Sequence, residues 1–197
     1  MATPAKINFK VYQGSTFAEV LRWETPTKVY KTITGISQTA PVVITTSTPH
    51  DIPSNWRVKL TNIIGMTELN SSETYYIATN ITPTTFSINS INAVGYKAYV
   101  SGGIVEYNDP VNLEGFSARM QVRPNISSPI VLADLSSGTG DIILDNTNKT
   151  ITLIISDSVT ATFDFLTAVY GLEIVSPDGQ VTSFCNGTLT LVKEVTR

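Results

Sequence analysis

The sequence predicts an all-β protein, and three observations support this prediction. Charged residues make up 15% of the 197 residues, against roughly 25% in ordinary soluble domains. Thr, Ser, Asn, Val and Ile fill the shortfall, a composition that favours strands and turns over helices. Apolar and polar residues alternate with a period of two in several stretches, and Gly, Pro, Asn and Asp separate these stretches at short intervals.

The last thirty residues show the strand pattern most clearly. Tyr170, Leu172 and Ile174 alternate with small or polar residues, as on a strand with one buried face. Residues 177–179, Pro-Asp-Gly, then form a turn, because Pro fixes φ at the first corner and Gly accepts a positive φ. Apolar residues resume after the turn and again after Asn186-Gly187. The pattern predicts a β-meander that forms the base of the fold.

Two more strands are expected near the N-terminus, at residues 7–12 and 17–23. The second is apolar on both faces near Val20 and Leu21, which favours a central position in a sandwich, and Pro26 is expected to end it. The same alternation of apolar and polar residues returns after residue 109. Strands are expected there at 116–123, 130–135, 141–144 and 149–155. Ser156 is a candidate N-cap for one or two helical turns.

Between Tyr30 and Tyr107 the strands become shorter and the turns more frequent. Six short strands in under eighty residues predict a small barrel. We therefore expect an immunoglobulin-like β-sandwich made of residues 1–29 and 106–197, with residues 30–105 inserted as a small β-barrel. Such an insertion requires that its entry and exit lie close together on a surface loop.

Composition and charge also limit which classes of function are possible. The net charge is −3, and the 13 basic residues are scattered, so no patch indicates a nucleic-acid partner. No apolar run approaches the roughly 20 residues that span a membrane, and the first residues lack the features of a signal peptide. Cys185 is alone, which predicts a buried apolar side chain with no intrachain disulfide and no cysteine metal cluster. We expect synthesis in a cytoplasm without export.

Candidate catalytic and metal-binding residues all have plainer interpretations. His50 is the only histidine; a Pro-His turn in which the ring bonds the backbone accounts for it better than a catalytic triad does. Asp134, Asp141 and Asp145 fit turns better than a calcium loop.

The carboxylates Glu106, Asp109 and Glu114 have no spacing that indicates a glycosidase pair. The sequence therefore predicts no enzyme, no metal and no cofactor.

Aromatic and arginine side chains supply the candidate interface residues. Trp56, Tyr96 and Tyr99, together with other tyrosines of the insert, would suit either a sugar-binding platform or the core of a small barrel. Arg119 and Arg123 alternate on the polar face of their strand, and two aligned arginines in a chain of low charge indicate a protein interface. These five residues are the predicted partner-contacting set.

The insert resembles a module that recurs in tail proteins of tailed phages. The resemblance lies in residues 33–36 (ITGI), 45–50 (TTSTPH), 65–70 (GMTELN) and 99–103 (YVSGG). This module is also similar to the small β-barrel known as the first catalytic cysteine half-domain of ubiquitin-activating enzymes. That likeness concerns the fold and implies no ubiquitin chemistry.

The frame around the insert is similar to immunoglobulin-like N-terminal domains of phage baseplate and fibre-attachment proteins. The similarity lies in residues 113–123 (LEGFSARMQVR), 170–174 (YGLEI) and 177–179 (PDG), with Gly171 where such domains often carry Asp. Together the two resemblances imply a structural virion component, present in several copies, that docks other tail, baseplate or fibre proteins. They imply no nucleic-acid or membrane partner and bring no catalytic residues.

Two alternatives to this structural role remain open from the sequence. One is a carbohydrate- or receptor-binding module on the virion surface that uses the Tyr and Trp residues of the insert. The other is a virion enzyme such as a depolymerase, which would need clustered acids or a metal site.

Overall fold

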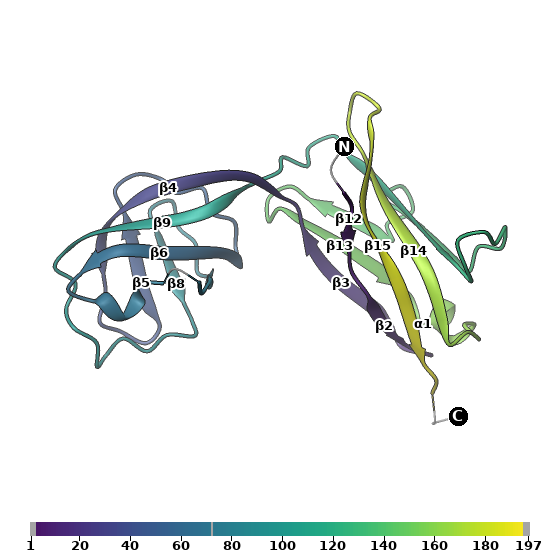
Figure 1. Cartoon of the computed structure of the whole chain (residues 1–197), viewed down its shortest axis with the longest axis horizontal. Coiled ribbons are helices and arrows are strands. Elements are labelled where there is room, and N and C mark those ends of the chain that lie inside the picture. The colour runs from purple at the N-terminus through teal and green to yellow at the C-terminus, as the bar shows by residue number, and fades with distance from the viewer. Residues whose placement is uncertain (1–2, 72, 195–197) are drawn as a thin grey trace. The chain divides into compact units, whose positions relative to one another are not determined.

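The computed structural model describes residues 3–71 and 73–194 and divides the chain into two compact units, whose regular elements are almost all strands (Figure 1). The first unit joins the residues up to Trp23 with those from Asn112 onward, and the second comprises Glu24–Val111. The elements of the first unit are β1 (Ala5–Lys6), β2 (Phe9–Tyr12), β3 (Phe17–Arg22), β10 (Ser117–Arg123), β11 (Ala133–Ser136), β12 (Ile142–Asp145), β13 (Thr150–Ile155), α1 (Asp157–Ala161), β14 (Thr167–Val175) and β15 (Val181–Val192). Those of the second are β4 (Glu24–Ile36), β5 (Val42–Thr46), β6 (Trp56–Ile64), the 3₁₀ turn η1 (Thr67–Leu69), β7 (Tyr76–Ala78), β8 (Thr85–Ile88) and β9 (Ser101–Pro110).

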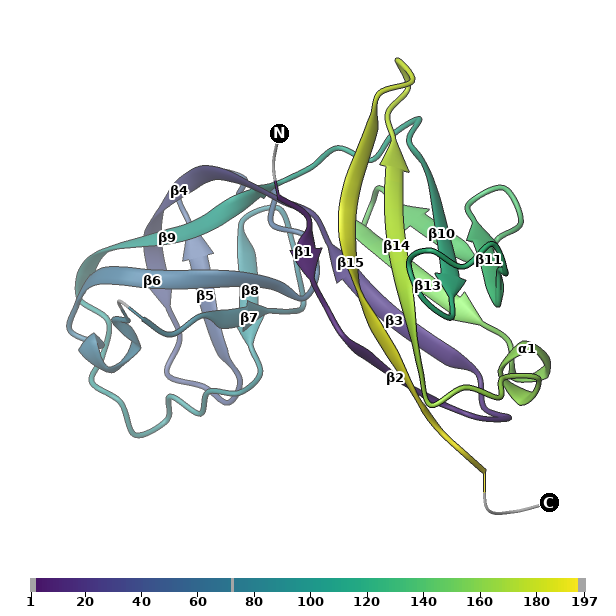
Figure 2. The ribbon, with the colours of Figure 1, turned by 45° about the vertical axis from the view of Figure 1, so that its right-hand side comes forward.

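The first unit is a two-sheet sandwich with immunoglobulin-like topology. One sheet has the order β1-β15-β14-β10-β11, with β2 also paired to β15, and the other has the order β12-β13-β3 (Figure 2). In immunoglobulin terms β3, β10, β14 and β15 are strands B, C, F and G, and the second unit is inserted between B and C. The all-β sandwich with an inserted barrel, expected from the sequence, is confirmed.

Strict alternation of side chains explains the sandwich core. On β10 the buried residues Ala118, Met120 and Val122 alternate with polar residues on the other face, and β14 alternates in the same way. Between the sheets the hydroxyl of buried Tyr170 donates to the carbonyl oxygen of Ile7 at 2.9 Å, and so satisfies a polar group that burial would otherwise penalise.

The N-terminal segment is held against the closing meander. β1 and β2 both pair in parallel with β15, and between them the backbone N–H of Ile7 donates to the carbonyl oxygen of Asn186 at 2.9 Å. The single strand expected at residues 7–12 is thus divided at residues 7–8. The central position expected for the second strand is wrong, because β3 pairs only with β13 among the described residues and Val20 is half exposed.

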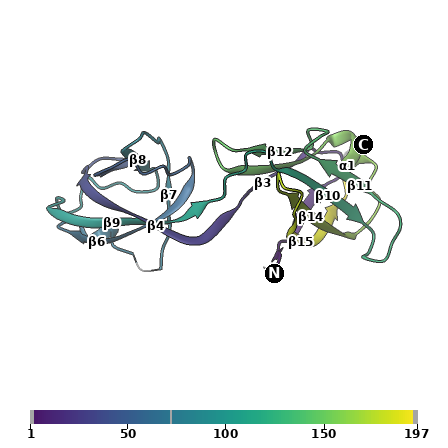
Figure 3. The ribbon, with the colours of Figure 1, turned by 90° about the horizontal axis from the view of Figure 1, so that it is seen from above.

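The second unit is a nearly closed six-stranded barrel with the order β7-β6-β9-β4-β5-β8. Reciprocal backbone hydrogen bonds between Thr79 and Ser87, of 2.8 and 2.7 Å, link the two ends of this sheet. Figure 3 shows the strands of this unit curving around its interior. Fully buried side chains from all sides fill that interior, including Trp56, Leu60, Met66 and Phe86.

The strands that enter and leave the barrel are longer than the sequence indicates. β4 begins at Glu24, although Pro26 was expected to end a strand there, because the register shifts between Glu24 and Lys28 and the extra residues bulge out. Its partner β9 continues to Pro110. Tyr30 and Tyr107 lie on this pair, since Val29 pairs with Tyr107 and Tyr30 with Glu106. Residues 24–29 and 106–111, all expected in the sandwich, therefore belong to the barrel unit.

The helix expected after Ser156 is present as one short turn. The Ser156 hydroxyl accepts from the backbone N–H of Val159, as an N-cap does. The β-branched residues that follow limit α1 to five residues. Neither helix of the described residues has the length and apolar character to cross a membrane.

Candidate docking site

The outer face of the larger, six-stranded sheet of the sandwich presents mostly polar residues in cross-strand rows. The middle row crosses five of these strands, β11, β10, β14, β15 and β1, and Gly171 on β14 lies at its centre. Its members in order are Asp134, Gln121, Gly171, Asn186 and Lys6. Arg119 and Glu173 lie in the row on one side, and Arg123, Val169 and Thr188 lie in the row on the other.

This face is hollowed into a groove of about 820 Å³. Gly171 lines the groove, and a Cβ atom built on it would meet no atom within 4 Å. A strand position without a side chain, surrounded by longer side chains, leaves a depression in the sheet surface. Its volume lies within the roughly 300–1,000 Å³ of pockets that hold small ligands.

Arg119 and Glu173 form an ion pair at one end of the groove. The Nη2 and Nε atoms of Arg119 each lie 2.7 Å from Oε2 of Glu173. The two side chains retain 61% and 41% of their surface, so solvent screens the pair and its contribution to stability is small. A partner can therefore compete for either side chain at little cost.

Arg123 is held differently. Its Nη1 donates to the carbonyl oxygen of Ser128 at 2.7 Å and its Nη2 to Oε1 of Gln121 at 2.8 Å. Both acceptors are neutral, and no described carboxylate lies within 4.0 Å of this guanidinium. The structure thus fixes the orientation of Arg123 without neutralising its charge.

An exposed apolar loop adjoins Arg123. Ile126, which is 92% exposed, lines the groove, and Ile130 and Val131 of the same loop are also exposed. Several large apolar side chains close together at the surface are typical of contact sites for other proteins. Arg119 and Arg123, the two arginines predicted as interface residues, are therefore brought into one groove beside an apolar edge.

The predicted interface residues of the barrel are placed differently. Trp56 is fully buried, and its indole N–H donates to the carbonyl oxygen of Asn108 at 2.9 Å. Its assignment to a surface site is wrong, because the folded barrel leaves none of it accessible. Tyr96 and Tyr99 are half buried against the core, and the Tyr99 hydroxyl contacts the carbonyl oxygens of Ile33 and Gly102 at 3.1 and 2.9 Å.

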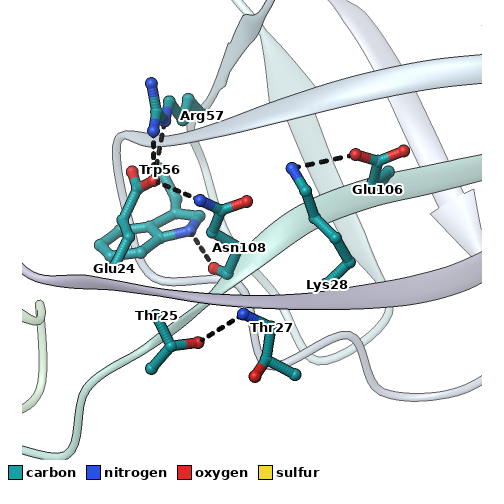
Figure 4. Close-up of polar contacts among 8 residues, drawn as sticks. All are labelled: Glu24, Thr25, Thr27, Lys28, Trp56, Arg57, Glu106 and Asn108. Atoms are coloured by element: carbon teal, nitrogen blue, oxygen red, sulfur yellow. Dashed lines mark hydrogen bonds and ion pairs between the residues drawn. The ribbon is translucent and has the colours of Figure 1, made fainter.

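A second polar cluster lies on the outside of the barrel, where β4, β6 and β9 run side by side (Figure 4). Arg57 pairs with Glu24, with 2.5 Å between Nη2 and Oε2, and the same carboxylate oxygen accepts from Asn108 at 3.1 Å. Lys28 pairs with Glu106 at 3.0 Å, and this contact raises the pKa of Lys28.

Three cations of this cluster surround the ring of Tyr75. The charged groups of Arg57, Lys59 and Lys28 lie 4.8, 4.7 and 6.0 Å from its centroid, within or at the limit of cation–π range. Sequence reasoning did not predict this arrangement, because Lys28 lies on β4, Arg57 and Lys59 lie on β6, and Tyr75 precedes β7.

His50 is a structural residue. It has no exposed surface, its Nδ1 accepts from the backbone N–H of Ile52 at 3.0 Å, and its Nε2 lies 3.2 Å from the carbonyl oxygen of Thr85. Since Nδ1 accepts, Nε2 carries the proton and donates to Thr85. Burial lowers the pKa of His50 and keeps the ring neutral. The backbone-bonding role expected for it is confirmed.

The acidic candidates also have local roles. Asp145 accepts from the backbone N–H groups of Thr147 and Asn148, and a side-chain hydrogen bond from Asn148 contributes most to lowering the pKa of Asp145. Asp141 accepts from the Thr139 hydroxyl. Within the described residues, no three His, Cys, Asp or Glu side chains gather as metal ligands would.

Of the three carboxylates considered as a glycosidase pair, Glu106 is paired to Lys28 on the barrel. Asp109 also lies in the barrel unit, on β9, whereas Glu114 belongs to the sandwich.

Several residues of the groove were missed by sequence reasoning. In the sequence, nothing distinguishes Lys6, Gln121 and Asp134 from other solvent-facing strand residues. Only the register of the paired strands brings them into one row. Gly171 carried a usable signal, since a Gly at a polar position within a strand often marks a close approach or a hollow.

Comparison with known proteins bears on the barrel. The family model described as the ubiquitin-activating enzyme E1 FCCH domain matches residues 37–108. The barrel is similar to that half-domain. This confirms the resemblance of the insert to the half-domain, but the match covers less than half of the chain and identifies no family for the whole. The half-domain brings no catalytic residues to this chain, and Cys185 lies outside it. No curated protein matches the chain.

Proposed function

We propose that this chain is a structural virion component of a tailed phage, a tail, baseplate or fibre-adaptor protein that docks neighbouring subunits or fibres. The observation that carries a docking role is the hollow outer face of the sandwich, where Arg119 and Arg123 lie in one groove beside the exposed Ile126. Arginine and apolar side chains together are typical of the residues that dominate protein interfaces.

The assignment to a phage particle is supported by sequence resemblance. The strings that resemble phage tail modules lie in the barrel at residues 33–36, 45–50, 65–70 and 99–103, and the strings that resemble baseplate domains lie on β10 and in the β14–β15 hairpin. In this role the chain is present in several copies, and its partners are other tail, baseplate or fibre proteins.

Sugar binding by the aromatic residues of the insert has less support. Trp56 is inaccessible, and the Tyr99 hydroxyl already contacts two backbone carbonyl oxygens. A sugar platform needs exposed ring faces and free hydroxyls, which Trp56 and Tyr99 do not offer.

The proposed function is tested in assembled particles. Purified virions should contain the chain in a fixed copy number, and a map of the particle should place it in the tail or baseplate. Deletion of its gene should give particles that lack fibres or stop at an intermediate of tail assembly. Complete, infectious particles after deletion, or absence of the chain from purified virions, would refute the proposal.

A further inference from the structure

We propose that the groove on the outer face of the sandwich binds an extended acidic segment of a neighbouring protein. One carboxylate of that segment meets Arg123, and an apolar side chain beside it packs on Val169 and Ile126. This inference rests on the proposed docking function and names the chemistry of the partner.

The shape of the groove favours an extended segment. The middle row runs across five strands from Asp134 to Lys6, and at its centre Gly171 leaves open space. The amide side chains of Gln121 and Asn186 flank this space and offer both donors and acceptors. A chain laid in the hollow meets amides on both sides.

The charges favour an acidic occupant. Lys6, Arg119 and Arg123 line the groove together with only two acids, Asp134 and Glu173. Glu173 is already bound to Arg119 at 2.7 Å, which leaves two cations facing one carboxylate. The groove therefore has an excess of positive charge, although the chain as a whole carries −3.

Arg123 is the side chain that binds the partner's carboxylate in this proposal. Two of its nitrogens are held by Ser128 and Gln121, and guanidinium has five N–H donors, so donors remain for a ligand. Because neutral groups already orient its side chain, little conformational entropy is lost when a carboxylate binds. A charge-assisted pair formed there is stronger than a hydrogen bond between neutral groups.

Apolar surface lies directly beside this arginine. Val169 is its cross-strand neighbour on β14, and Ile126 belongs to the loop that follows β10. Ile126 is 92% exposed, so a partner side chain that covers it removes apolar surface from water. The expected motif is therefore Asp or Glu next to an aliphatic or aromatic residue.

The test is a selection from a random heptapeptide library displayed on mRNA, with the whole 197-residue chain as bait. Selected peptides should be enriched in Asp or Glu next to an apolar residue. The best peptide and a copy with Gln or Asn in place of its acid are then titrated against the chain. The acidic form should bind at least about tenfold more tightly.

Variants of the chain test whether the peptide binds in the groove. Arg123→Gln should weaken the acidic peptide about tenfold and leave the amide peptide unaffected, as a double-mutant cycle for a direct pair requires. Gly171→Val should abolish binding by filling the hollow, and the Cβ atom of the new side chain meets no atom within 4 Å. Lys10→Gln removes a cation of the adjacent strand β2 that does not line the groove, and it should bind as the wild type does.

Any of four results overturns the inference: a selection without binders, selected peptides without acids, an acid preference that survives Arg123→Gln, or full binding by Gly171→Val. Failure of the virion assignment is a separate outcome. In that outcome the chain is absent from virions, while the double-mutant cycle still shows coupling between Arg123 and the acid of the peptide. The groove proposal then stands, and the acidic partner is sought outside the virion.

Discussion

Gly171 and Gly187 lie on adjacent strands one residue apart in register, yet only at Gly187 would an added Cβ atom meet another part of the fold. Gly187 pairs with Tyr170, and Gly171 pairs with Asn186. A Cβ atom on Gly187 would lie 1.8 Å from the carbonyl oxygen of Ile7, whereas one on Gly171 would meet nothing within 4 Å. The missing side chain at Gly187 makes room for the N-terminal segment, and the missing side chain at Gly171 leaves the groove open.

Gly187→Ala should therefore destabilise the sandwich. The new methyl group cannot coexist with the Ile7 carbonyl, so the N-terminal strands must shift away from β15, at a cost of roughly 2–4 kcal/mol. Chemical denaturation followed by fluorescence in a Trp56→Phe background measures this, because the remaining Trp23 packs on Phe116 and Phe184 of the sandwich. Gly171→Ala is the matched control and should be neutral or stabilising by up to about 1 kcal/mol. Equal stabilities for the two variants would contradict the contact at Ile7.

Trp56→Phe should destabilise the barrel. The substitution removes the hydrogen bond to Asn108 and leaves a buried carbonyl oxygen and a small void, with an expected loss of about 1–3 kcal/mol. The variant retains Trp23 as its one tryptophan, so barrel unfolding is followed by circular dichroism. A variant as stable as the wild type would show that Trp56 is not a core anchor.

The stability of the barrel should fall as the pH drops below about 6.5. Burial lowers the pKa of His50 in the folded state, so the unfolded chain takes up a proton before the folded one does. Protonation then favours unfolding, and the stabilisation present at neutral pH is lost as pH falls through the unfolded-state pKa. Denaturation is followed at about pH 7.5 and about pH 5.5 by the fluorescence of two single-tryptophan variants, Trp23→Phe for the barrel and Trp56→Phe for the sandwich.

Two controls accompany the pH experiment. His50→Asn keeps an acceptor near the N–H of Ile52 and should lose the pH dependence. The sandwich contains no histidine, so its midpoint, followed by Trp23, should change less. The assignment of this pH dependence to His50 is refuted if the denaturation midpoints of both units shift alike with pH, or if His50→Asn keeps the wild-type shift.

Arg119→Gln should leave stability within about 0.5 kcal/mol of wild type, because solvent screens the exposed pair with Glu173. Thermal unfolding checks this expectation. A loss above about 1 kcal/mol would mean that the pair organises the fold and does not merely line the groove.

Cys185 should react slowly with thiol reagents in the folded chain. It has no exposed surface, burial raises the pKa of its thiol, and the Tyr170 hydroxyl lies 3.7 Å from its sulfur. Reaction with Ellman's reagent should follow opening of the sandwich and accelerate in Gly187→Ala. Rapid labelling of the wild type at low denaturant concentration would show that the β14–β15 hairpin is open.

Local pattern indicated where most of the strands lie and, on β10 and β14, which face is buried. The alternation on β10 and β14 separates Ala118 and Leu172 in the core from Arg119 and Glu173 outside it, because successive side chains point to opposite faces. Ser156 determined a helix start, and a run of short strands indicated the barrel. These inferences need only neighbouring residues, and the structure bears them out.

Only the tertiary structure decided which strands become neighbours. Pro26 looked like a strand end, but a bulge lets β4 continue past it. Trp56 looked like a surface anchor, but barrel closure buries it, since a side chain's exposure depends on what the rest of the chain packs against it. The row from Asp134 to Lys6 joins segments more than a hundred residues apart, and register between distant strands depends on long-range pairing that no local spacing records.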